Sequence, residues 1–299
     1  MRLRSLVLIV ACALAVPQVA SADADAHYKQ GLAYKNQGKT DEAIKSMESA
    51  VADNPKHGMA WGSLGNLYKT KGKIPEAVKA YENAVALIKK DKVLWANLGM
   101  AYYRDKQLDK ALEALTTAKQ LDPKDAEILG NLGTVRRQKG DNAGAIVDLE
   151  AAVKLKPDDA GFRNNLGVAY RVAKRDDDAI KAFSKAIELS PNDPGFHFNL
   201  AVVYRRKEEP EKAIPLYEKA VKLDPGNADA YFDLGYMYKL NHENDKAIGA
   251  FQKYLDLNKA KKGTEDKAAS QRICEEIAAV GGTGKGCDTK PPPKTPPKK

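Results

Sequence analysis

Small and apolar residues recur along the chain with a period of 34 residues. Each unit has a small residue, which is glycine in six of the seven units, and an alanine twelve residues after it. The first series is Gly31, Gly65, Gly99, Gly133, Gly167, Ala201 and Gly235, and the second is Ala43, Ala77, Ala111, Ala145, Ala179, Ala213 and Ala247. A fixed step of this length indicates stacked copies of one small structural unit.

Within a unit, the apolar residues follow helical spacing twice, with a polar break between the two runs. In the second unit the first run contains Trp61, Leu64 and Tyr68, and the second contains Ala77 and Tyr81. The segment 71–73, Lys-Gly-Lys, separates them. Each run predicts one amphipathic helix. Because a single helix pair cannot bury its own apolar faces, neighbouring pairs must stack, and we predict an all-α solenoid.

The residue types at these offsets resemble the tetratricopeptide repeat. The second unit carries nearly the whole pattern: Trp61, Leu64, Gly65, Tyr68, Gly72, Ala77, Tyr81 and Ala84. The resemblance covers residues 24–261 as seven units, namely 24–57, 58–91, 92–125, 126–159, 160–193, 194–227 and 228–261. It implies a right-handed superhelical solenoid of helix-turn-helix repeats, in which the first helix of each unit lines a concave groove that binds protein partners.

Three residues depart from the repeat pattern or deserve a separate interpretation. Arg136 stands where the other units have tyrosine, and Pro215 falls inside the second predicted helix of the sixth unit. A proline there removes one backbone donor and favours a kink. His197 occupies the position of Trp61, so we expect it to be a packing residue.

The first 22 residues resemble a secretory signal peptide. Arg2 and Arg4 precede an apolar run from Leu6 to Val16, and Ala20-Ser21-Ala22 has the small residues that signal peptidase reads. The apolar run is too short to span a bilayer. We therefore expect cleavage after Ala22 and export, to a bacterial periplasm.

A second interpretation of the N-terminus involves Cys12. The sequence Ile9-Val10-Ala11-Cys12 loosely resembles a lipobox, in which Cys12 would be lipidated. The protein would then be anchored to a membrane, and we expect membrane anchoring only in that case.

One more helix is predicted after the last repeat, at residues 264–280, as a cap over the final pair. The residues Ala269, Ile273 and Ile277 mark its apolar face. In an exported chain Cys274 and Cys287 favour a disulfide, and two free thiols are the alternative. The tail, residues 289–299, has five prolines and four lysines and no apolar side chain besides, so we expect it to be disordered or polyproline II-like.

Composition and motifs give no sign of catalysis. The chain has a net charge of +9, but the repeat region 23–261 has 39 basic against 35 acidic residues, which argues against nucleic-acid binding. Only three cysteines and four histidines occur, without metal-ligand spacing. No phosphate-binding loop or nucleophile motif is found. We therefore predict no enzyme activity, no cofactor, no metal and no transmembrane segment in the mature chain.

A row of asparagines follows the first predicted helices. The sixth residue of four consecutive units is Asn97, Asn131, Asn165 and Asn199. An amide can both donate to and accept from a peptide backbone. The row resembles the asparagine ladder in the repeat domain of O-linked N-acetylglucosamine transferases, which implies binding of extended peptides. Asparagine is also common at this position in repeats of this type, and that interpretation stays open.

The twelfth residue of most units is basic. The predicted groove carries Lys69, Arg137, Arg171, Arg205 and Lys239 at this position. A positive row beside a neutral polar row favours an acidic or carboxylate-ended segment. The alternative is that these are ordinary solvated side chains.

Together these features predict an exported, non-enzymatic scaffold that binds protein partners in envelope assembly. A second hypothesis is a pilotin-like outer-membrane lipoprotein that assists a secretion or pilus machine, which requires lipidated Cys12. A third is a targeting subunit of an exported enzyme complex, with catalysis on another chain.

Overall fold

The computed structural model describes residues 16–260, 267–285 and 287, and these residues form fifteen α-helices and no strand. The chain divides into two compact units, Met1–Leu155 and Lys156–Lys299. Unit 1 contains α1 Val16–Asn36, α2 Thr40–Asp53, α3 Gly58–Thr70, α4 Ile74–Leu87, α5 Lys92–Arg104, α6 Leu108–Leu121, α7 Ala126–Gln138 and α8 Asn142–Leu155. Unit 2 contains α9 Ala160–Val172, α10 Asp176–Leu189, α11 Pro194–Arg206, α12 Pro210–Leu223, α13 Ala228–Leu240, α14 Asn244–Ala260 and α15 Lys267–Ala279.

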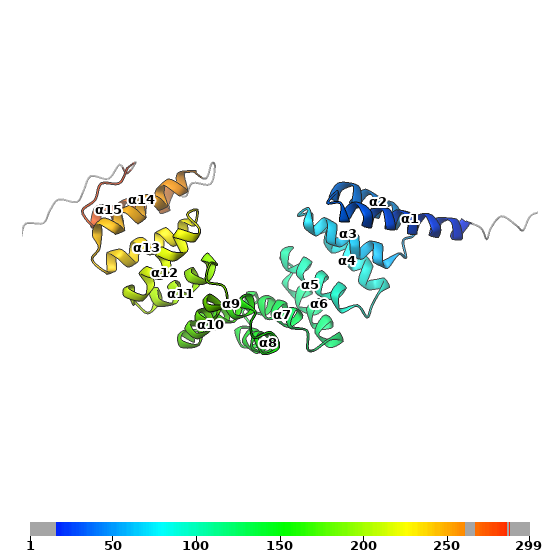
Figure 1. Cartoon of the computed structure of the whole chain (residues 1–299), viewed down its shortest axis with the longest axis horizontal. Helices are drawn as coiled ribbons and strands as arrows, with labels where there is room; N and C mark the ends of the chain where they lie inside the picture. The colour runs from blue at the N-terminus through cyan, green and yellow to red at the C-terminus, as the bar shows by residue number, and fades with distance from the viewer. Residues whose placement is uncertain (1–15, 261–266, 286, 288–299) are drawn as a thin grey trace, which may run out of the picture. The chain divides into compact units, whose positions relative to one another are not determined.

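Consecutive helices form seven pairs, as the sequence period predicts. We call the odd-numbered helices α1 to α13 the A helices and their even-numbered partners the B helices. Each A helix packs against the B helix of its own pair, and within each unit a B helix also packs against the next A helix (Figure 1). The predicted all-α tetratricopeptide architecture is therefore confirmed.

Most A helices begin directly after an aspartate or asparagine. The Asp91 carboxylate accepts hydrogen bonds from the backbone N–H groups of Val93 and Leu94, at 2.8 and 3.1 Å. Asp125, Asp159, Asp193 and Asn227 cap the later A helices in the same way. Such side chains satisfy backbone donors that the first helical turn leaves free. The last residue of each sequence unit thus determines where the next helix begins.

The turn between the two helices of a pair needs one residue in the left-handed region. Glycine fills it in three pairs, at Gly38, Gly72 and Gly140, with φ between 74° and 87°. Lys106, Lys174, Glu208 and His242 fill it in the other four, with φ of 56° to 61°. Glycine adopts this conformation without steric cost, whereas the other residues do not.

The repeated glycine near the middle of six of the seven A helices lets the two helices of a pair approach closely. A Cβ atom at Gly65 would lie 2.7 Å from the Tyr81 ring, and one at Gly167 would lie 2.7 Å from the Phe183 ring. Both rings are fully buried. A larger residue would separate the helices, so the glycine period reflects packing.

Ion pairs connect successive repeats at their turn edges. Lys71 lies 2.9 Å from Asp41, and Lys207 lies 3.1 Å from Asp177, a separation of 30 residues in each case. Asp177 belongs to the run Asp176–Asp178, which occupies the first turn of α10, where carboxylates are favoured by the helix dipole. All four residues are exposed, so each pair contributes little by itself.

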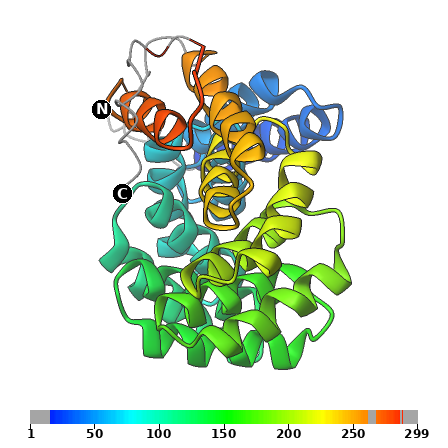
Figure 2. The same ribbon diagram turned by 90° about the vertical axis from the view of Figure 1, so that its left-hand side faces the viewer.

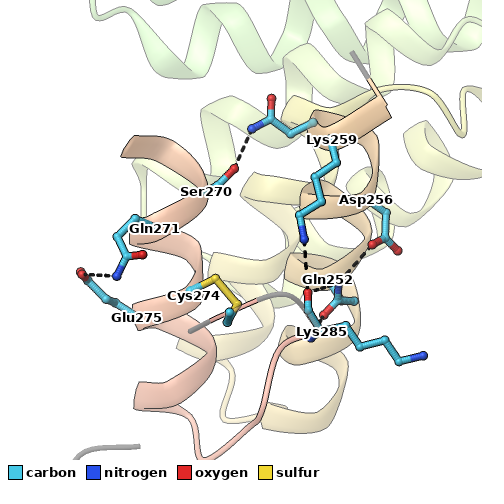
Figure 3. The surroundings of a disulfide bond; sticks show 10 residues. Gln252, Asp256, Lys259, Ser270, Gln271, Cys274, Glu275 and Lys285 are labelled. Atoms are coloured by element: carbon cyan, nitrogen blue, oxygen red, sulfur yellow. Dashed lines mark hydrogen bonds between the residues drawn. A yellow bond between two sulfur atoms is a disulfide. The ribbon is translucent and has the colours of Figure 1, made fainter. Parts of the chain in front are cut away.

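The last helix, α15, packs against α14 (Figures 1 and 2). The Asn258 amide on α14 donates to the Ser270 hydroxyl at 2.9 Å. A disulfide joins Cys274 on α15 to Cys287, and the segment between them returns along α14, where the Lys285 backbone N–H donates to Gln252 (Figure 3). The bond closes a short loop that holds this segment against the cap.

Some segments predicted from the sequence lie partly or wholly outside the described residues. The predicted signal sequence up to residue 15, including Cys12, and the tail 289–299 lie outside the described residues. Helix α1 begins at Val16 and continues through the predicted cleavage site after Ala22. The range 264–280 contains α15, while residues 264–266 lie outside the description. Helix α12 continues past Pro215 to Leu223. No helix among the described residues is long and apolar enough to cross a bilayer.

Candidate peptide-binding site

The four asparagines of the predicted ladder all lie on A helices and are partly exposed. Asn97 is on α5 and Asn131 on α7 in unit 1, and Asn165 is on α9 and Asn199 on α11 in unit 2. The Asn199 amide donates to the Asn164 side chain of the preceding repeat at 2.9 Å. Neighbouring repeats in unit 2 therefore contact each other through this row.

The basic row and the polar row are not independent. The Lys69 ammonium on α3 donates to the Asn97 side-chain carbonyl on α5 at 3.2 Å. Burial lowers the pKa of Lys69, and the neighbouring Arg104 guanidinium acts in the same direction. The cation of one repeat therefore orients the amide of the next, and it leaves the Asn97 NH₂ group as the donor side.

In unit 2 a residue of the basic row also contacts the ladder position of the next repeat, but this position holds an aspartate instead of an asparagine. Arg205 on α11 lies 3.4 Å from the carboxylate of Asp233, which holds the ladder position on α13. The Tyr217 hydroxyl on α12 also donates to this carboxylate at 3.0 Å. Burial raises the pKa of Asp233 above its ordinary value, against the opposing effect of Arg205.

The cap supplies the acid for the last basic residue of the row. The Lys239 ammonium on α13 forms an ion pair with Glu276 on α15, and the Tyr236 hydroxyl donates to the same carboxylate at 3.2 Å. Helix α15 thus takes the place that a further A helix would have. A hollow of about 490 Å³ adjoins this contact and is lined by Arg205, Tyr236, Lys239, Leu240 and His242.

The other two predicted basic residues also lie on A helices. Arg137 is partly exposed near the end of α7, and Arg171 is partly exposed near the end of α9. The Arg171 carbonyl accepts a hydrogen bond from the Arg206 guanidinium of the next repeat at 2.9 Å. The sequence therefore places the row correctly on the A helices, but it did not predict these contacts between repeats. The spacing of 28 residues from Lys69 to Asn97 is the signal that could have done so.

Two histidines outside these rows have structural partners. The ring of His197 is buried and lies 2.9 Å from the Pro191 carbonyl oxygen, so it packs as predicted. His27 pairs with Asp53 at 2.7 Å. Among the described residues no group of three His, Cys, Asp or Glu side chains could hold a metal ion. The arrangement on the A helices can bind polar main-chain and carboxylate groups.

Family models match most of the chain. A model described as "Cilia and flagella-associated protein 70 C-terminal domain" matches residues 9–232, which is more than half of the chain. A second model, described as "Tetratricopeptide repeat", matches residues 216–249. No curated protein sequence matches the chain.

Solved structures with similar folds include several repeat proteins. The chain is 26% identical to a chain of the APC/C hetero-tetramer Cut9–Hcn1, with a TM-score of 0.61, and the match covers 74% of this chain but only 45% of that one. It is 29% identical to MamA, with a TM-score of 0.51, over 55% of this chain and 96% of MamA. A tetratricopeptide repeat protein from Parabacteroides merdae ATCC 43184 has 18% identity and a TM-score of 0.67, over 86% of this chain and 99% of that one. The last of these shares the fold alone.

Proposed function

The chain belongs to the tetratricopeptide repeat family, in the group described as the Cilia and flagella-associated protein 70 C-terminal domain, and from this premise we propose that it is a non-enzymatic scaffold that holds extended segments of protein partners along its A helices. The fold is of a kind suited to protein interaction. We further propose that these segments bind to the face of the A helices that carries the asparagine row and the basic row.

The observation that carries this proposal is the contact between the two rows. Lys69 holds the carbonyl of Asn97, so the Asn97 NH₂ group has a fixed direction before any ligand arrives. A donor whose orientation is already fixed loses less conformational freedom on binding. Amides fixed in this way are suited to the carbonyl groups of an extended backbone, whatever its side chains.

The basic row supports a preference for acidic segments. Glu276 is an internal example, because its carboxylate is bound by Lys239 and Tyr236 at the end of the row. A carboxylate of a partner that reached another basic residue of the row would meet similar chemistry. We therefore extend the proposal to acidic or carboxylate-ended segments.

The disulfide supports export. Disulfides persist in oxidising compartments such as the periplasm and are rare in the cytosol. The Cys274–Cys287 bond is therefore what an exported chain would contain. We propose that the protein works in envelope assembly after export, with Asp23 as its mature N-terminus. Intact-mass measurement of protein from the native envelope tests this, since a diacylglycerol adduct at Cys12 would contradict it.

Peptide selection tests the binding proposal. Peptides that bind the immobilised chain are selected from a random 12-residue library, and their affinities are then measured for variants. Asn131→Ala combined with Asn165→Ala should weaken diverse selected peptides by about tenfold, because each lost hydrogen bond costs about 1 kcal/mol. This loss should change little with salt, since amides carry no charge.

Charge variants separate the two rows. Changing Arg137, Arg171 and Arg205 to glutamine should weaken acidic peptides selectively, and the loss should shrink as salt rises. Lys185→Glu with Lys219→Glu is the matched control, because both residues lie on B helices. If the control abolishes binding while the A-helix variants have no effect, the proposal is wrong.

A further inference from the structure

A hollow lies between the last three helices of unit 2, which are α13, α14 and α15 (Figure 1). It has a volume of about 280 Å³ and is lined by Asp229, Phe232 and Tyr236 of α13, Tyr254 of α14, and Ala269 and Arg272 of α15. We call it the aromatic hollow. Of these described lining residues, none belongs to the asparagine row or the basic row.

Three of the lining side chains are aromatic and are tilted against one another. The centre of the Phe232 ring lies 5.0 Å from that of Tyr236 and 5.4 Å from that of Tyr254, and each pair is inclined by 59°. Because the rings do not lie in one plane, a ligand in the hollow meets aromatic surface from more than one direction. A cation close to several rings is attracted by each of them.

The packing of unit 2 holds these rings in place. The Tyr236 ring packs edge-on against the fully buried Phe251 ring, with 5.3 Å between their centres, and the Tyr236 hydroxyl donates to Glu276 at 3.2 Å. Tyr254 is 9% exposed. A ligand therefore meets rings that are already ordered, and little conformational freedom is lost on binding.

The seventh repeat departs from the other six at two of these positions. Tyr254 stands where every other repeat has an alanine, and those alanines are fully buried. Tyr236 stands where the others have leucine, asparagine, methionine, threonine or valine. The two tyrosines are therefore specific to the repeat that meets the cap, and the helix packing that all repeats share does not explain them.

The lining of the hollow carries one charge of each sign. Asp229 lies in the first turn of α13 and Arg272 lies on α15, both are exposed, and neither forms an ion pair with another described residue. Burial, followed by Glu276, raises the pKa of Tyr236, and the Arg272 guanidinium opposes this shift, so its charge reaches the ring. A ligand with a cation at one end and an acid at the other can pair with both charges.

The size and the aromatic lining narrow the ligand class. A volume of about 280 Å³ corresponds to about nine water molecules at about 30 Å³ each, and it is smaller than most sites for drug-sized ligands. A primary ammonium group is strongly hydrated. A methylated ammonium group instead offers methyl groups to aromatic rings, and it is the cation that aromatic cages bind.

We propose that the aromatic hollow binds small free zwitterions of the betaine class, which carry a methylated ammonium group and an acid group. The ammonium group contacts the three rings and is neutralised by Asp229, and the acid pairs with Arg272. This solute site is additional to the proposed function and does not depend on it, because the residues that line it are different.

Saturation-transfer NMR and calorimetry with the full chain test the proposal with three solutes. Glycine betaine should bind saturably at millimolar concentrations, and its N-methyl protons should receive the strongest saturation. Choline keeps the ammonium group but lacks the acid, and tert-butylacetate has the shape of betaine with carbon in place of nitrogen. Both should bind at least about tenfold more weakly, since each lacks one of the two charges.

Charge variants locate the site, because betaine and choline should respond to one of them in opposite directions. Arg272→Gln should weaken betaine by about fivefold and should strengthen choline, since it removes an attraction for the acid and a repulsion of the ammonium group. Asp229→Asn should weaken both solutes. Lys253→Gln is the matched control, because it removes an exposed charge of α14 that does not line the hollow, and it should change neither affinity.

Two further variants test the rings. Phe232→Leu keeps an apolar side chain but removes one aromatic surface, and it should weaken betaine by about fivefold. Tyr254→Ala restores the residue of the other six repeats and should abolish measurable binding. Circular dichroism shows whether each variant is folded, and the half-buried Phe232 provides the decisive variant if Tyr254→Ala does not fold.

Phosphatidylcholine vesicles distinguish a free solute from a lipid headgroup that carries the same two charges. The chain should not sediment with them, and sedimentation that betaine abolishes would assign the hollow to a membrane lipid instead.

The proposal is also overturned if betaine does not bind saturably or if tert-butylacetate binds as tightly. The same holds if Arg272→Gln fails to shift betaine and choline in opposite directions while circular dichroism shows an intact fold. Acidic peptides selected for the A helices should bind equally well with and without betaine, so the two proposals can fail separately.

Discussion

Helix α5 of the third repeat and helix α7 of the fourth repeat use different chemistry at the same position of the pattern. On α5, the Tyr102 hydroxyl donates to Glu82 on α4 of the preceding repeat at 2.6 Å. On α7, Arg136 replaces the tyrosine, and its guanidinium lies 2.7 Å from Asp148 on α8 of its own repeat. Lys119 on α6 lies 2.7 Å from the same carboxylate, which is 1% exposed. A hydrogen bond from a neutral hydroxyl is thus replaced by a buried charge with two cations.

The difference comes from three coupled changes in the repeat pattern. Asp148 occupies a position that is alanine in four other repeats, and Lys119 one that is valine in four others. Arg136 by itself would place a charge against an apolar junction. Because Asp148 and Lys119 change with it, the three charges satisfy one another. Repeats therefore tolerate a buried charge where its neighbours compensate it.

The largest expected effect follows from removing the shared acid. Asp148→Ala removes the buried carboxylate that Arg136 and Lys119 share, and we expect a loss of about 2 kcal/mol in the free energy of unfolding, since hydrogen bonds to charged groups are lost while both cations stay partly exposed. Urea denaturation monitored by circular dichroism measures it. A loss below about 1 kcal/mol would mean that the two cations reach water without cost.

A second variant replaces all three charged residues by the residues that are common at these positions in the other repeats. The triple variant Lys119→Val, Arg136→Tyr and Asp148→Ala should be at least as stable as the natural protein, because well-packed apolar groups often replace a buried ion network with a gain of about 1 kcal/mol or more. The same denaturation experiment decides it. If the triple variant is as unstable as Asp148→Ala, the three charges make a net favourable contribution to the free energy of unfolding, beyond compensating one another.

The sequence predicts the fold well because the repeat imposes its packing at every step. Gly65 and Gly167 sit where a Cβ would meet an aromatic ring, so the 34-residue period encodes helix contacts directly. The candidate site was predicted less completely. The pattern placed Asn97 and Lys69 on A helices, but a contact between successive repeats depends on side-chain reach, which a one-repeat pattern does not contain.

The pair of Arg136 and Asp148 shows which information a repeat pattern lacks. The pattern identifies Arg136 as a departure from tyrosine, but it does not identify Asp148 as its partner, because the pairing depends on which side chains meet across α7 and α8.

A smaller effect is expected for the neutral contact. Tyr102→Phe removes the hydroxyl that Glu82 accepts and keeps the buried ring, so we expect a loss of about 1 kcal/mol, the usual net value of one hydrogen bond. The exposed Glu82 carboxylate can be rehydrated, which limits the loss. Thermal or urea unfolding measures it. A loss as large as that of Asp148→Ala would remove the distinction between the two contacts.

The smallest effect concerns Asp233, a buried acid with weaker compensation than Asp148. Arg205 lies 3.4 Å away and Tyr217 donates one hydrogen bond, and burial still raises the pKa of Asp233. The folded chain therefore holds this proton more tightly than the unfolded chain, so the contribution of Asp233 to stability is present below its unfolded pKa and is lost as pH rises through its folded pKa. Asp233→Asn does not titrate and can still accept from Tyr217. The stability of this variant relative to the natural protein should increase with pH from about 4 upward, which urea denaturation at a series of pH values measures. The opposite slope would mean that Arg205 compensates Asp233 as fully as the two cations compensate Asp148.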